Sequence, residues 1–205
     1  MARSLVAQAY ADRFTGITYG GLPDESPQGL THVLGASVPG LDAGAPRQLM
    51  GSADASWGDK ALYGQALTYN GGTVFHQTKK LGLIVDSTHE AEAIATTKLA
   101  EVAEPARSVL RAIGVPEQQA TVLMTDNRAN ELVANNTGSS SRSRHFLRRY
   151  FVLRQRVAHG CVAVVKVEDP QMPADFLTKW VPAAKLRASI DYLTNARRGA
   201  ELGQS

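Results

Sequence analysis

The stretch Met50–Asp59, "MGSADASWGD", predicts a β-strand that carries one carboxylate. One face of the strand holds Leu49, Gly51, Ala53, Ala55 and Trp57, and the other holds Met50, Ser52, Asp54 and Ser56. This period of two is typical of a strand, and it predicts that Trp57 is a core residue. Asp54 alone is a weak signal, because a sheet can leave one face in water. Its meaning depends on whether other carboxylates converge on it.

Composition indicates one globular domain with a substantial core, since 43% of the 205 residues are hydrophobic. The net charge of +3 is too small to indicate a nucleic-acid partner by itself. A single cysteine, Cys161, excludes an internal disulfide and favours a reducing compartment. No apolar run approaches the roughly 20 residues of a membrane helix, so no membrane partner is expected.

Around this strand the patterns predict two further strands and then alternating helices and strands. Residues 64–78, "GQALTYNGGTVFHQT", form a predicted hairpin around Asn70-Gly71. A helix is expected over 88–113, split in two by Pro105. The later expected strands cover 120–125 and 161–167, and the later expected helices cover 127–136, 141–160, 172–180 and 183–198. Upstream, residues 3–14 are weakly helical, 16–21 resemble a short strand that ends in a turn, and 21–47 are read as a long loop.

The first long helix places an acid on its apolar stripe. Helical spacing puts Glu92 on the same face as Ala95, Leu99 and Val102, and Glu90 about 200° away toward solvent. A buried unpaired carboxylate costs several kcal/mol, so a lysine, a proton or a metal should compensate it. A position near the solvent-exposed edge of the domain is the simpler alternative for Glu92.

Two more acids, Asp126 and Asp175, occupy positions that suit ligand binding but that also have an ordinary structural explanation. Asp126 follows a buried strand, at the edge where α/β sheets bind ligands, although an Asp there can simply belong to a turn. Asp175 lies in the first turn of an expected helix, where it can simply cap the helix. Taken together, Asp54 on a strand, Glu92 on a helix, Asp126 on a strand and Asp175 on a helix have the layout of the carboxylates in the ribonuclease H fold. Four hard oxygen donors suit two magnesium ions on one phosphodiester.

Several segments strengthen this interpretation, because the chain resembles the ribonuclease H domain of copia-type LTR retrotransposon Pol polyproteins over about residues 10–195. "SADASWGD" resembles that family's Ser-Asp-Ala-Asp-Trp-Ala-Gly-Asp, and "STHEAEAIA" resembles its Ser-Ser-Thr-Glu-Ala-Glu-Tyr-Val-Ala. "TDNRANELVAN" is similar to Cys-Asp-Asn-Gln-Ser-Ala-Ile-Ala-Leu-Ala, and "MPADFLTKWVP" to Gln-Leu-Ala-Asp-Ile-Leu-Thr-Lys-Pro-Leu-Pro. "SRSRHFLRRYFVLRQRVAHG" resembles Ser-Arg-Thr-Lys-His-Ile-Asp-Ile-Arg-Tyr-His-Phe-Val-Arg-Glu, and "DRFTGITYGG" the end of the preceding connection segment.

The chain departs from the family pattern at a few positions. Ser56 stands where the family often has a second aspartate, Ala93 replaces an aromatic residue and His89 replaces a threonine. Residues 22–46 look inserted. None of these departures removes a proposed metal ligand.

The resemblance implies a fold and a domain organisation. The expected fold is an α/β ribonuclease H-like fold with a mixed five-stranded sheet, three antiparallel strands followed by two parallel ones, and helices on both faces. Residues 1–48 would be an N-terminal segment ending the polymerase connection region, 49–180 the ribonuclease H domain, and 181–205 a C-terminal helix and tail.

The resemblance also implies hydrolysis of the RNA strand of RNA–DNA hybrids during reverse transcription. Asp54, Glu92, Asp126 and Asp175 would be the catalytic metal ligands for two Mg2+ ions, with Mn2+ as a substitute. Asp54 would bridge both ions, Glu92 and Asp126 would hold one, and Asp175 the other.

Substrate binding must come from other residues, since four acids repel phosphate. The candidates are Ser56, Lys79, Lys80, Asn127, Asn130, Arg144, His145 and Arg148. Lys79 and Lys80 are expected in a loop before the first long helix. The helix over 141–160 is rich in arginine around an apolar stripe that includes Tyr150 and Phe151, although these arginines can also be an ordinary solvated face. His145 can equally be structural.

The expected partners are the RNA–DNA hybrid and the reverse transcriptase polymerase of the same polyprotein. The expected location is a cytoplasmic virus-like particle or the nucleus. Two alternatives stay open: a catalytically inactive or domesticated ribonuclease H fold that binds nucleic acid or protein, and a DNA nuclease of the same fold.

Overall fold

The computed structural model describes residue 17 and residues 49–58, 60–82, 85–115, 117–135 and 147–195. Its strands are β1 (Leu49–Ala55), β2 (Leu62–Tyr69), β3 (Gly72–Lys80), β4 (Thr121–Thr125) and β5 (Val162–Lys166). Its helices are α3 (Thr88–Ala112), α4 (Arg128–Ala134), α5 (Leu147–Ala158) and α6 (Ala183–Thr194), with short 3-10 turns η2 (Asp169–Gln171) and η3 (Asp175–Leu177). The expected elements upstream of residue 48 lie outside the described residues, apart from Ile17.

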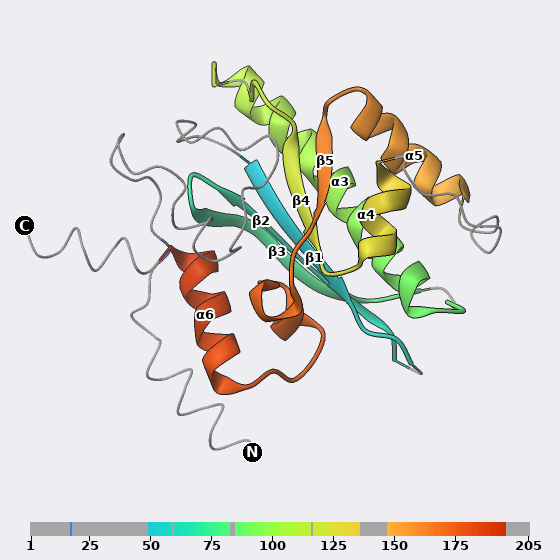
Figure 1. Cartoon of the computed structure of the whole chain (residues 1–205). Helices are drawn as coiled ribbons and strands as arrows, with labels where there is room; N and C mark the ends of the chain where they lie inside the picture. The colour runs from blue at the N-terminus through green and yellow to red at the C-terminus, as the bar shows by residue number, and fades with distance from the viewer. Residues whose placement is uncertain are drawn as a thin grey trace, which may run out of the picture.

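The five strands form one mixed sheet in the order β3-β2-β1-β4-β5 (Figure 1). β1, β2 and β3 pair antiparallel, whereas β4 and β5 run parallel to β1, as the sequence predicts. Asn70 and Gly71 join β2 to β3, and both have the positive φ that a tight hairpin turn requires. The sheet prediction is therefore confirmed down to its turn.

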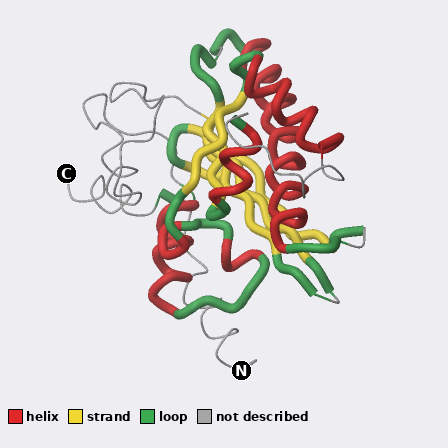
Figure 2. Tube along the Cα trace, turned by 45° about the vertical axis from the view of Figure 1, so that its right-hand side comes forward, coloured by secondary structure: helices red, strands yellow, loops and turns green. Residues whose placement is uncertain are grey.

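Helices cover both faces of the sheet (Figures 1 and 2). On one face, α3 and α5 bury the larger core cluster, which includes Leu67, Leu99, Leu123 and Leu153. On the other face, the segment that contains α6 buries a smaller cluster, formed by Met50, Val122, Met124, Val167 and Met172. Because both faces are covered, every residue of β1 is buried, including the polar face of the predicted strand.

Pro105 does not split the first long helix, contrary to expectation, since α3 is continuous from Thr88 to Ala112. A proline removes one backbone hydrogen bond within a helix. Here buried side chains lie on both sides of it, among them Leu99, Ala103 and Leu110. Packing against the sheet along the whole helix outweighs that local cost.

Glu90 was expected to point to water, but it is 9% exposed. Its backbone N–H donates to Ser87 Oγ at 3.2 Å, and its carboxylate accepts from the Asp86 N–H at 2.9 Å. These reciprocal bonds satisfy donors at the start of α3, much as a capping box does. Local capping therefore draws the Glu90 side chain back over the helix end.

The segment 172–180 was also expected to begin an α-helix, but it forms only the single turn η3. Thr178 follows that turn, and its hydroxyl contacts both Asp54 and the backbone oxygen of Asp175. Tertiary bonds thus outweigh the local helical propensity of this segment.

Candidate active site

Two neighbouring parallel strands bring the first two carboxylates to one edge of the sheet. Asp54 lies near the carboxyl end of β1, and Asp126 directly follows β4, which pairs with β1. Asp54 is fully buried, whereas Asp126 is partly exposed. Ligand sites of open α/β sheets lie at this edge, so a pocket for a charged group is expected here.

Helix α3 delivers the third carboxylate. Gly51 allows the helix to approach β1, because a Cβ at this position would lie 2.7 Å from Leu99 Cδ2. Glu92 is 3% exposed, and its Oε1 accepts a bond from the Ala55 N–H at 3.1 Å. The helical register predicted from the apolar stripe is thus confirmed for Glu92.

The turn η3 carries the fourth carboxylate, Asp175, which is fully buried. Gly64 on β2 pairs with Asp54, and a Cβ on this glycine would lie 2.5 Å from Leu177 Cβ. The missing side chain at Gly64 therefore lets η3 sit close to the sheet. This approach brings the Thr178 hydroxyl to Asp54 Oδ2, where it donates a hydrogen bond.

The carboxylates form two groups, and within each group the ligand oxygens all lie within 4.8 Å of one another. Asp54, Glu92 and Asp126 make the first group, and Asp126, Asp169 and Asp175 make the second. The four predicted residues thus come together, and Asp126 belongs to both groups. The expected bridging role of Asp54 stays a prediction. Asp169 was missed because an acid in "VEDPQ" carries no pattern that separates it from an ordinary surface residue.

The donor set fits a divalent cation. Asp54 Oδ1 and Glu92 Oε2 are buried and accept no hydrogen bond in the described part of the chain. Buried carboxylate oxygens without hydrogen bonds are costly unless a cation or proton compensates them. Hard oxygen donors of this kind are the ligands that Mg2+ and Mn2+ prefer.

Burial also makes these acids hold their protons. Burial raises the pKa of Asp54 to about 6, although the Thr178 hydrogen bond and the Lys179 charge oppose the shift. Burial, with the charges of Asp54 and Asp126, raises the pKa of Glu92 to about 9. Burial raises the pKa of Asp126 as well. Without a metal, protons thus take up part of the excess negative charge.

These shifts predict that the metal-free protein loses stability as the pH rises. Asp54 and Glu92 bind protons more tightly in the folded state than in the unfolded chain. This contribution to stability is fully present below the pKa values that the two acids have when unfolded, and it is lost as the pH rises through their folded pKa values of about 6 and about 9. Between pH 5.5 and 8.5 we expect the free energy of unfolding to fall by at least about 2 kcal/mol. Urea unfolding in EDTA at several pH values measures it. A flatter profile is expected for Glu92→Gln, and a wild-type profile that rises with pH would contradict the prediction.

Two lysines neutralise the η3 side of the site. Lys179 Nζ lies 3.1 Å from Asp175 Oδ1, 3.5 Å from Asp54 Oδ1 and 3.8 Å from Asp169 Oδ1. Lys185, on α6, contacts Asp175 Oδ2 and lies 3.3 Å from Asp169 Oδ2. Partial burial lowers the pKa of Lys179, but Asp54 and Asp175 outweigh this effect and raise it. The ammonium therefore stays charged.

Sequence reasoning missed these groups, although one signal for them was available. Thr178 and Lys179 stand in "LTK", which matches the Leu-Thr-Lys of the family motif. Lys185 had no such signal, because only the packing of α6 brings it to Asp175.

The proposed substrate-binding residues on the sheet lie at the same edge as Asp54. Ser56 Oγ accepts from the Leu62 N–H at 3.1 Å and closes the end of the β1–β2 pair. Lys79 and Lys80 end β3 and are exposed; they were expected in a loop, but the strand continues because they pair with β2. In register, Thr78 lies two strands from Asp54, about 10 Å across the sheet. The two lysines therefore flank the carboxylates at a distance suited to a neighbouring phosphate.

The two asparagines beyond Asp126 differ in exposure. Asn127 caps α4, accepting from the N–H groups of Ala129 and Asn130, and its amide contacts His89 Nδ1 at 2.8 Å. It is partly exposed beside the carboxylates. Asn130 is 1% exposed, and its amide donates to Thr96 Oγ1 at 2.7 Å and to Thr125 Oγ1 at 3.2 Å. Its burial corrects the expectation of a substrate contact: Asn130 joins α3, β4 and α4.

The arginine-rich helix is only partly described. Arg144 and His145 lie outside the described residues, as does the side chain of Arg148 in α5. Arg154 Nε donates to the Val133 oxygen at 2.7 Å, and Arg156 pairs with Glu104 at 2.9 Å. The side chains of these two arginines thus bind other groups of the same protein.

Two aromatic side chains expected in apolar positions are exposed. Phe151 is 60% exposed on α5, where Tyr150 and Leu153 face the core. Trp57 is 59% exposed and donates from Nε1 to the Val85 oxygen at 3.0 Å. Because β1 ends at Ala55, the alternation that predicted a core position no longer applies to Trp57.

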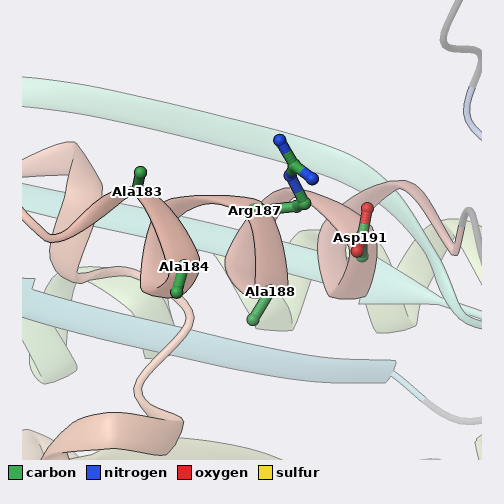
Figure 3. A pocket seen from close by; sticks show the side chains of 5 residues that line it. All are labelled: Ala183, Ala184, Arg187, Ala188 and Asp191. Atoms are coloured by element: carbon green, nitrogen blue, oxygen red, sulfur yellow. The ribbon is translucent and has the colours of Figure 1, made fainter.

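A groove of about 400 Å³ lies beside α6, outside this site. It is lined by Ala183, Ala184, Arg187, Ala188 and Asp191, which Figure 3 shows on successive turns of the helix. At 100° per residue these positions lie on the side of α6 away from Lys185, which contacts the carboxylates.

The strand order and the carboxylates at the ends of β1 and β4 define a protein of the ribonuclease H fold. The structure matches LC11-RNase H1, solved in complex with an RNA/DNA hybrid, over 63% of this chain and 93% of that one, with a TM-score of 0.50 and 11% identity. RNase H1 of Halobacterium salinarum matches over the same shares, with a TM-score of 0.47 and 18% identity. The predicted fold class is confirmed.

In sequence, the chain is similar to the retrovirus-related Pol polyprotein from transposon TNT 1-94 of Nicotiana tabacum. The two are 30% identical over 126 residues, which is 62% of this chain and 9% of the polyprotein. This match confirms the predicted resemblance to a retrotransposon Pol polyprotein. No family model matches the chain. None of the helices in the described ranges combines the length and apolar character that a membrane crossing requires.

Proposed function

We propose that this chain is a divalent-metal-dependent ribonuclease H that hydrolyses the RNA strand of RNA–DNA hybrids. The observation that carries the proposal is the pair of carboxylate groups sharing Asp126 at the carboxyl edge of the sheet. A binding module has no evident need for buried acids that lower its own stability. The similarity to the tobacco Pol polyprotein supports a role in copia-type retrotransposon reverse transcription.

The chain's own residues suit this reaction. Asp54, Glu92 and Asp126 would hold one cation, and Asp175 with Asp126 or Asp169 a second. Bound Mg2+ or Mn2+ would supply the Lewis acidity that activates water and stabilises charge on the leaving 3′-oxygen. The Ala55 N–H binds Glu92 Oε1, and Oε2, which has no hydrogen-bond partner, would be available to the cation. Because Glu92 holds a proton in the metal-free protein, loading the site would release it.

We further propose that the partners are the hybrid and the polymerase of the same polyprotein. The activity would then reside in a cytoplasmic virus-like particle or the nucleus. Exposed Lys79 and Lys80 would bind a phosphate beside the carboxylates, and Asn127 would contact the strand nearest Asp126. Arg144, His145 and Arg148, whose side chains lie outside the part of the chain that the structure describes, stay candidates for the same role.

A cleavage assay on three substrates tests the function. RNA–DNA hybrid, double-stranded RNA and double-stranded DNA are incubated with the protein, with Mg2+, with Mn2+ and with EDTA. Metal-dependent cleavage of the hybrid's RNA strand is expected. Cleavage of double-stranded DNA would support the DNA-nuclease alternative. Metal-independent binding of the hybrid without cleavage would support the inactive binding module.

The lysine pair predicts a change in the salt dependence of binding. The double variant Lys79→Ala/Lys80→Ala should bind the hybrid more weakly and flatten the slope of log affinity against log salt by one to two units, about 0.7–0.9 per lost phosphate contact. Fluorescence anisotropy in Ca2+ measures this slope. Lys98→Ala is the matched control, since Lys98 pairs with Glu101 on the exposed side of α3. An unchanged slope in the double variant would show that neither lysine contacts a phosphate of the hybrid.

A further inference from the structure

The two halves of the carboxylate site are neutralised differently. Around Glu92, no lysine or arginine of the described residues forms an ion pair, and Oε2 has no hydrogen-bond partner. Around Asp175, by contrast, each carboxylate oxygen faces an ammonium group, Oδ1 that of Lys179 and Oδ2 that of Lys185. The Asp175 side is therefore already filled with protein cations.

Lys179 also reaches across to the other half. Its Nζ lies 3.5 Å from Asp54 Oδ1, an oxygen that is buried and accepts no hydrogen bond. The same ammonium thus contacts both carboxylate groups, Asp54 of the first and Asp169 and Asp175 of the second. A divalent cation held by the same carboxylate oxygens would have to displace the ammonium, because both would need the same lone pairs and their charges repel each other.

We propose that Lys179 is an internal cation that competes with divalent metal for the Asp126–Asp169–Asp175 group. The Asp54–Glu92–Asp126 side then fills first, and the Asp175 side fills only when the Lys179 ammonium moves away. The side chain can move, since it is 40% exposed and carries its charge on a flexible four-carbon stem. This inference rests on the proposed metal-dependent function and makes Lys179 a positioning residue that sets the metal requirement.

A purely structural role for Lys179 makes a different prediction. If the side chain only held η3 against β1, its loss would loosen the site and weaken metal binding. Competition predicts the opposite: metal binds more tightly without the ammonium, while the metal-free protein becomes less stable because Asp54 and Asp175 lose their counter-charge. The two changes have opposite signs, so together they separate the roles.

Mn2+ binding to the full chain tests the competition, followed by calorimetry and by electron paramagnetic resonance to count bound ions. Lys179→Gln removes the charge and keeps much of the length, and it should bind its weaker Mn2+ at least tenfold more tightly than the wild type. Its melting temperature in EDTA should fall. Lys179→Arg keeps the charge and should retain the wild-type affinity. Lys98→Gln removes a surface charge elsewhere and should change neither quantity.

The outcomes separate this inference from the function on which it rests. Wild-type Mn2+ binding with an unchanged or weaker Lys179→Gln isotherm would overturn the competition and leave the metal site intact. Absence of Mn2+ binding in both proteins would overturn the metal-dependent function as well. Tighter binding in Lys179→Arg, equal to that of Lys179→Gln, would also overturn the inference, because the charge would then not be the cause.

Discussion

Replacing Asp54 by Asn is expected to reduce hybrid cleavage by a thousandfold or more, on the order seen when a central catalytic group is removed. Asp54 belongs to the buried carboxylate group with Glu92 and Asp126, and its Oδ1 is free of hydrogen bonds. The amide keeps the size of the side chain and an oxygen that can accept the Thr178 bond, but it lacks the charge that binds a cation.

Single-turnover cleavage at saturating Mg2+ measures the effect, with urea unfolding to show that the variant stays folded. At pH 8 the metal-free variant should be at least as stable as the wild type, because one buried negative charge has been removed. Asp191→Asn is the control, since Asp191 faces the groove beside α6. Normal cleavage by a folded Asp54→Asn protein would overturn the assignment of the metal site.

Glu92→Gln and Glu90→Gln should differ in activity by orders of magnitude, although the residues are only two positions apart. Glu92 Oε1 accepts from the Ala55 N–H, its Oε2 has no hydrogen-bond partner, and its carboxylate is grouped with those of Asp54 and Asp126. The amide therefore loses a ligand charge within this group. Glu90 instead accepts from the Asp86 N–H at the start of α3. Its amide should leave the rate within a few-fold and reduce stability by about 0.3–1 kcal/mol, from the weaker interaction with the helix dipole.

Single-turnover kinetics on both variants under one metal concentration decides the comparison. Metal binding gives a second readout, because Glu92→Gln should weaken Mn2+ binding and Glu90→Gln should leave it unchanged. An inactive Glu90→Gln protein beside an active Glu92→Gln protein would mean that the other glutamate is the ligand and that α3 is placed in the wrong register.

The carboxylate site shows how far periodicity alone reaches. A period of two placed Asp54 on a strand, a period near 3.6 placed Glu92 on the buried face of a helix, and the Asn70-Gly71 turn defined the β2–β3 hairpin. Each of these patterns spans only a few residues, and the forces behind it act between near neighbours. The same patterns failed where a neighbour in space intervened: Trp57 lies past the end of β1, and packing keeps α3 continuous through Pro105.

Sequence periodicity and motif order thus determined the sheet, its hairpin and the four acids that converge on its edge. Tertiary structure alone decided which groups surround those acids. Thr178 meets Asp54 across 124 positions of the chain, and Lys185 reaches Asp175 only because α6 packs beside η3. The presence of Asp126 in both carboxylate groups likewise depends on distances between separate elements. Local preferences act within a turn or a strand, whereas the balance of charge in a buried site depends on every element that packs against it.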